Sequence, residues 1–143
     1  MRKLCKAVAL FIVGAAVYWG VEFGWRWLVG TLPVHWTMPV LGGFLFLVLG
    51  GINEYLPWDF SLVCQATIGT VVITAAELVA GLVLNVALGL AIWDYSHLPH
   101  NFMGQICLGF SAAWLPLSIV AIVLDDWMRY WLFGEDKPHY SVF

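Results

Sequence analysis

The sequence predicts an all-α integral membrane bundle of four transmembrane helices. Of its 143 residues, 62% are hydrophobic and only 10% are charged. A soluble domain of this size could not hide so much apolar surface from water. The apolar residues also form four segments that are each long enough to cross a bilayer, which takes about 20 helical residues. We therefore expect a single transmembrane domain over residues 1–133 and a polar C-terminal tail over residues 134–143.

The first half of the chain supplies two of these helices. The first covers about residues 4–29 and follows a basic start, a pattern that is also typical of a signal peptide. Its apolar character continues past Glu22, however, which makes the segment long enough to span. The second covers about residues 38–56, where two glycine pairs would let helices approach closely. Residues 57–59 read as a tight turn.

The second half supplies the other two helices. The apolar segment over residues 60–92 is too long for one perpendicular span, so we expect it to tilt, project or break, with Gly81 or Gly89 as break points. The fourth helix is predicted over about residues 102–131, with a kink at Pro116 because proline removes a backbone hydrogen bond.

Lysine and arginine set the expected orientation. All of them except Arg26 lie near the two ends of the chain, whereas the connections over residues 30–37 and 93–101 contain neither. Cytoplasmic segments carry the excess of these residues. We therefore predict a plasma-membrane protein with both termini in the cytoplasm and these two connections outside.

Charged residues within the spans are costly and therefore suggest function. In the first helix, Tyr18, Glu22 and Arg26 share one face, and an ion pair lowers the cost of burying either charge. The third helix carries a narrow polar stripe of Thr67, Thr70, Thr74, Glu77, Gly81 and Asn85.

The depth of these residues predicts one polar pocket. At about 1.5 Å per helical residue, Glu22 lies about 22 Å above Ala7, and Glu77 lies about 25 Å above Phe60. Both acids therefore belong to the outer half of the membrane. Other polar residues expected at the same level are Arg26, Asp94, Asn101 and Gln105. Such a cluster could simply fix helix register, but two acids, a base and two amides exceed that need and favour a substrate or ion site.

Several kinds of chemistry find little support. Asp94, His97 and His100 could be metal ligands, but histidines in a solvated loop are far commoner, so we expect no metal and no cofactor. The sequence has no P-loop motif, and nothing in it suggests nucleic-acid binding. Its three cysteines are far apart and indicate no disulfide framework.

A set of motifs resembles a known family. Residues 93–96 (Trp-Asp-Tyr-Ser) and residues 101–108, followed by Ser111 and Trp114, resemble the signature of the CmpB-like family of predicted ABC-transporter permeases. Residues 74–81 are similar to its threonine–glutamate–glycine segment. Related small eukaryotic transmembrane proteins share some of these pieces. The resemblance implies a permease-type role, and the matching positions are Glu22, Glu77, Trp93, Asp94, Tyr95, Ser96, Asn101, Gly104 and Gln105.

The leading hypothesis is a small transporter or permease-type protein with an acidic pocket toward the outer side. The pocket would bind a cation or a proton-coupled small solute, and the nine candidate ligand-binding residues are Glu22, Arg26, Glu77, Trp93, Asp94, Tyr95, Ser96, Asn101 and Gln105. One alternative is a membrane-embedded enzyme or sensor for a lipid-like ligand, although we expect no catalytic residues. Another is a structural subunit of a larger complex. Besides lipid, the expected partner is a second copy of the chain or another membrane subunit.

Two further expectations concern individual acids. We expect Glu22 and Glu77 to face each other, with one held ionised by Arg26 while Glu77 exchanges a proton or cation. Asp94 is expected to cap the start of the fourth helix, where an acid is favoured.

Overall fold

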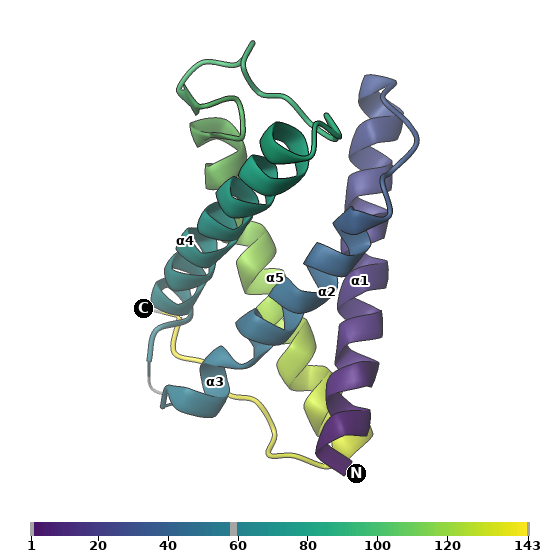
Figure 1. Cartoon of the computed structure of the whole chain (residues 1–143). Coiled ribbons are helices and arrows are strands. Elements are labelled where there is room, and N and C mark those ends of the chain that lie inside the picture. Colours follow the sequence, from purple (N-terminus) through teal and green to yellow (C-terminus); the bar gives the residue numbers. More distant parts are fainter. Residues whose placement is uncertain (1, 58–59, 143) are drawn as a thin grey trace. The chain divides into compact units, whose positions relative to one another are not determined.

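The computed structural model describes residues 2–57 and 60–142. Within these residues, four helices are long and apolar enough to cross a membrane (Figure 1). They cover Lys3–Val29, Thr37–Tyr55, Leu62–Ala87 and Leu108–Phe133. The chain is thus an all-α membrane protein, as its composition predicted. Of the tight turn expected at residues 57–59, Trp58 and Asp59 lie outside the described residues.

The structure consists of two compact units. The first unit contains the described residues up to 57 together with residues 121–140, and the second contains residues 60–120 and the described residues after 140. Helix α5 (Leu108–Phe133) therefore contributes its first half to the second unit and its second half to the first. The single transmembrane domain expected over residues 1–133 stays a prediction.

The first unit is built on two helices that lie side by side, α1 (Arg2–Val29) and α2 (Thr37–Gly50) (Figure 1). A Cβ atom added at Gly42 would lie 2.2 Å from Cβ of Tyr18, so glycine is required for this close approach, as the sequence predicted. A short helix, α3 (Ile52–Tyr55), follows α2 after one residue. The buried core of the unit consists of Leu10, Phe46 and Met128.

The second unit begins with α4 (Leu62–Gly81), which continues as a π-helix, η1 (Leu82–Ala87). The third span therefore ends at Ala87, earlier than the expected end at residue 92. Gly89 and Ala91 have positive φ angles of 66° and 49°, which a right-handed helix does not accept. The change to π geometry directly after Gly81 and the end of the helix before Gly89 agree with the two predicted break points.

The fourth predicted helix begins later than expected. Residues 102–107 were expected to be helical, but β1 (Asn101–Phe102) pairs antiparallel with β2 (Ile106–Cys107) in a short hairpin. The reason is the backbone at the hairpin tip, where Met103 and Gly104 have positive φ angles of 55° and 69°. Helix α5 starts at Leu108 and continues through Pro116.

Candidate functional site

The carboxylate of Glu77 is the centre of the polar residues in the second unit. Glu77 lies on α4 and is only 6% exposed. Its Oε1 accepts a hydrogen bond from the Tyr95 hydroxyl (3.0 Å), and its Oε2 accepts one from the Trp114 indole N–H (3.1 Å). The Tyr95 ring stacks on Phe110, with 4.8 Å between the ring centroids. Both carboxylate oxygens are thus held, one by the loop before α5 and the other by α5 itself.

Asn85 of η1 fastens this loop to the end of the third span. Its Oδ1 accepts a hydrogen bond from the backbone N–H of Ile92 (2.7 Å), and its Nδ2 donates to the carbonyl of Trp93 (3.0 Å). The same Nδ2 lies 2.9 Å from Oε1 of Gln105, which is 6% exposed. The indole N–H of Trp93 then donates to the backbone carbonyl of Gln105 (2.9 Å). These bonds give the loop a defined path instead of a solvated, irregular one.

Asp94 closes a turn within the loop. Its carboxylate accepts hydrogen bonds from the backbone N–H of Ser96 (2.8 Å) and from the Ser96 hydroxyl (2.9 Å). These two bonds favour the ionised carboxylate and hold the pKa of Asp94 below its ordinary value, with a smaller contribution from His97. The expectation that Asp94 caps the fourth helix is wrong, because that helix begins only at Leu108.

Asn101 organises the hairpin that follows. Its Nδ2 donates to the carbonyl of Leu98 (2.8 Å), and its Oδ1 accepts from the backbone N–H of Gly104 (3.1 Å). The carbonyl of Gly104 accepts in turn from the N–H of Tyr95 (2.8 Å). Asn101 and Gln105 therefore lie in a hairpin whose tip is fixed against Tyr95.

Glu22 and Arg26 form the ion pair that their spacing predicted. On α1, the Arg26 Nε donates to Oε1 of Glu22 at 2.6 Å, and the two side chains are only 12% and 17% exposed. This pair belongs to the first unit, whereas Glu77 belongs to the second. The expected approach of Glu22 to Glu77 therefore stays a prediction.

The second unit brings together seven of the nine candidate residues. They are Glu77, Trp93, Asp94, Tyr95, Ser96, Asn101 and Gln105. Trp93 is 9% exposed, and its indole N–H donates to a backbone carbonyl of the same loop. This residue therefore stabilises the loop's conformation. Two contributors were not among the candidates, namely Asn85 and Trp114. The sequence did contain a signal for both: Asn85 is the last residue of the polar stripe, and Trp114 is the last position of the family signature.

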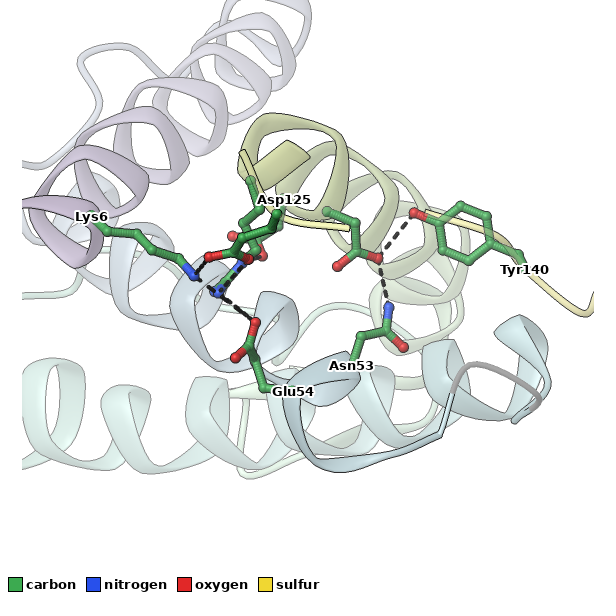
Figure 2. Close-up of polar contacts among 8 residues, drawn as sticks. Lys6, Asn53, Glu54, Asp125 and Tyr140 are labelled. Carbon is green, nitrogen blue, oxygen red and sulfur yellow. Dashed lines mark hydrogen bonds and ion pairs between the residues drawn. The ribbon is translucent and has the colours of Figure 1, made fainter. Parts of the chain in front are cut away.

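A second polar network, in the first unit, escaped the sequence analysis (Figure 2). Asp125 on α5 is fully buried and accepts a hydrogen bond from Nε of Arg129, one helical turn later. The Nη1 of Arg129 donates to Oε1 of Glu54 on α3 at 2.9 Å. A Cβ atom added at Gly50 would lie 2.0 Å from Cγ of Asp125, so only glycine leaves room for this carboxylate beside α2.

Asp126, the next residue, bonds in another direction. Its Oδ2 accepts from Nδ2 of Asn53 (2.6 Å) and from the hydroxyl of Tyr140 (3.0 Å), as the labelled Asn53 and Tyr140 in Figure 2 show. Burial, together with the negative charge of Asp126, raises the pKa of Tyr140 above its ordinary value of 10. The phenol therefore remains a hydrogen-bond donor at neutral pH.

The network borders a polar cavity of about 360 Å³. Its lining residues are Asn53, Glu54, Asp126, Arg129, Glu135 and Asp136. Four of these six are acids and one is a base, so the cavity carries an excess of negative charge. The i, i+4 spacing of Asp125 and Arg129 was a signal for this network, equivalent to the spacing that revealed Glu22 and Arg26.

Among residues 2–57 and 60–142, no three His, Cys, Asp or Glu side chains are placed to hold a metal ion. His97 and His100, the loop histidines weighed as metal ligands, belong to the segment that Asp94 and Asn101 organise.

Comparison with known proteins gives one assignment. No curated protein and no solved structure shows a match to the chain. Residues 10–133 match the family described as “Putative ABC-transporter type IV”. This range contains Glu22, Glu77 and the whole loop around Asp94, in agreement with the CmpB-like resemblance of the loop motifs. The chain therefore belongs to this CmpB family.

Proposed function

We propose that this permease-type protein binds a small cation, or couples the movement of a small solute to protons, at the carboxylate of Glu77. The supporting observation is the position of Glu77, a 6% exposed acid within a membrane-spanning helix whose two oxygens accept bonds from Tyr95 and Trp114. Carboxylates at such positions are costly and usually mark the path of an ion or proton.

The two donors differ in a way that selects one oxygen for protonation. An indole N–H can only donate, so Oε2 beside Trp114 must remain an acceptor. A phenol can either donate or accept, so the Tyr95 hydroxyl can reverse its bond and accept from a protonated Oε1. We therefore propose that a proton binds Glu77 at Oε1, where the Tyr95 hydroxyl can accept from it. Because Tyr95 belongs to the loop, protonation of Glu77 would alter a hydrogen bond made by the loop.

Replacing Glu77 with glutamine tests this role. If protons and cations compete for the same carboxylate, adding Na⁺ or tetramethylammonium to the weakly buffered, detergent-solubilised protein should release protons, which a pH-sensitive dye detects. We expect Glu77→Gln to fold and to release none, and to lose the uptake of the same cations into proteoliposomes, because an amide neither ionises nor exchanges a proton.

The matched control is Glu54→Gln, the same exchange of carboxyl for amide at a side chain that is 50% exposed and lies in the first unit. This variant should release protons as the unmodified protein does. Undiminished proton release and uptake by Glu77→Gln would rule out Glu77 as the exchange site.

The proposed orientation places the loop between η1 and α5 outside the cell and both termini in the cytoplasm. It rests on the absence of lysine and arginine from residues 30–37 and 93–101. In a cysteine-free background, Thr31→Cys and His97→Cys should react with an impermeant thiol reagent added to intact cells, whereas Ser141→Cys should not. Reaction of all three from the same side would exclude this arrangement.

A further inference from the structure

Two buried hydroxyl groups of the second unit have no hydrogen-bond partner among the described residues. In the polar stripe of α4, Thr67 and Thr70 each donate to a carbonyl of their own helix at 2.8 Å. Thr74 differs from them, because its Oγ1 is buried and unpaired. On α5, Ser118 is fully buried, and its Oγ is likewise unpaired. Buried polar groups without a partner are costly inside a membrane, which makes these two hydroxyls candidates for ligand binding.

The first half of α5 runs antiparallel to α4 within this unit (Figure 1). Gln105, which precedes α5, lies against Gly81 at the end of α4, where an added Cβ atom would be 2.5 Å from Oε1 of Gln105. Further along the chain, Trp114 bonds to Glu77, which lies one helical turn before Gly81. Later residues of α5 therefore meet earlier residues of α4.

Ser118 and Thr74 are the next pair in this order. Ser118 follows Trp114 by one turn on the same face of α5, and Thr74 precedes Glu77 by one turn on the stripe of α4. Side chains lean toward the N-terminal end of their helix, so the Glu77 carboxylate extends over the turn that contains Thr74. The same lean carries the Ser118 hydroxyl back toward Trp114. Both unpaired hydroxyls therefore lie near the carboxylate, on its side away from the loop between η1 and α5.

The charge of this segment favours a cation as the ligand. Residues 60–120 contain no lysine or arginine, and their acids are Glu77 and Asp94. Their histidines, His97 and His100, are exposed in the loop. The segment thus carries negative charge and no permanent positive charge. A carboxylate and two hydroxyls also offer only oxygen atoms, which are the ligands that hard cations prefer.

We propose that Glu77, Thr74 and Ser118 form one oxygen-lined site for a small alkali cation, for which Na⁺ is the probe. This inference rests on the proposed role of Glu77 and narrows its ligand from cations in general to a small inorganic ion. Ser118 is fully buried and Glu77 is only 6% exposed, so the bound ion must be small and largely dehydrated. Tetramethylammonium does not meet this requirement, because its methyl groups keep the charge away from the hydroxyl oxygens.

Removing either hydroxyl tests the site. Proton release by the weakly buffered, detergent-solubilised protein is measured over a range of NaCl concentrations and, separately, of tetramethylammonium chloride. We expect Na⁺ to release protons and tetramethylammonium to release none. Thr74→Val and Ser118→Ala should each raise the Na⁺ concentration for half-maximal release at least about tenfold, because each removes a polar contact to a charged ligand.

The matched control is Thr70→Val, the same exchange on the same stripe at a hydroxyl that already donates to the carbonyl of Ala66. It should respond to Na⁺ as the unmodified protein does. Thermal unfolding supplies a second readout, because a ligand that binds only the folded protein stabilises it. NaCl should raise the unfolding temperature above that in tetramethylammonium chloride, and Thr74→Val and Ser118→Ala should lose most of this difference. Without Na⁺, these two variants should be at least as stable as the unmodified protein, since neither hydroxyl bonds to another described residue.

The outcomes separate this inference from the role of Glu77. If Glu77→Gln abolishes proton release but Thr74→Val and Ser118→Ala respond to Na⁺ as the unmodified protein does, the two hydroxyls are not ligands and the inference fails alone. Equal proton release by tetramethylammonium and Na⁺ would overturn the assignment to a small ion and leave Glu77 as the exchange site. If neither cation releases protons from the folded protein, the role of Glu77 fails, and the proposed site fails with it.

Discussion

Replacing Asp125 with leucine should lower the free energy of unfolding by about 3–5 kcal/mol, the usual cost of removing one partner from a buried ion pair. The Asp125 side chain is fully buried and that of Arg129 is only 10% exposed, so the substitution leaves a guanidinium with little access to water. Glu54 remains bonded to Nη1 of Arg129, which favours the lower part of this range. Unfolding by denaturant in mixed micelles measures the change.

Two variants separate the buried charge from the general effect of mutation. The double substitution Asp125→Leu and Arg129→Leu removes both charges and should recover most of the lost stability, because apolar residues can replace a buried pair without penalty. Glu54→Gln removes another acid that pairs with Arg129, but at a 50% exposed side chain, and should cost less than about 1 kcal/mol. If Asp125→Leu lowers the free energy of unfolding by less than about 1 kcal/mol, the buried ion pair does not stabilise the fold as proposed.

The second large effect is expected at Asn85. Leucine at this position keeps the approximate volume but removes the bonds to Ile92, Trp93 and Gln105. At about 1 kcal/mol for each bond, with an added cost for any partner left buried and unpaired, we expect a loss of about 3 kcal/mol. The amide proton of Ile92 should also exchange much faster with solvent, since Asn85 is its acceptor.

Thr70→Val serves as the control for Asn85→Leu. Thr70 belongs to the same polar stripe, but among the described residues its hydroxyl bonds to the carbonyl of Ala66, in its own helix, at 2.8 Å. Its replacement should change neither the stability appreciably nor the hydrogen exchange of Ile92. If the Ile92 amide stays protected in Asn85→Leu, then Asn85 does not hold the loop to the third span.

The features that the sequence predicted well depend on neighbours in the chain. Span positions follow from the run of apolar residues, and the bond between Glu22 and Arg26 follows from helical spacing alone. Gly42 is a similar case, because small residues in a span indicate a close helix contact before the partner is known.

The errors concern segments whose conformation depends on side chains bonding to a distant backbone. Residues 102–107 are apolar enough for a helix, but Asn101 bonds the hairpin tip and Met103 takes a positive φ angle. Asp126 gave no signal of its own, because its partners Asn53 and Tyr140 lie 73 and 14 residues away. Hydropathy and periodicity contain no information about such pairings.

The loop between η1 and α5 has a consequence for making affinity reagents against this protein. Its hairpin tip displays Phe102 and Met103, which are 56% and 60% exposed, on a backbone that Asn85 and Asn101 hold in one shape. A synthetic peptide of residues 93–107 lacks Asn85 and would present the same side chains in many shapes. An antibody selected on the folded protein would therefore recognise an epitope that an antibody raised on the peptide would not.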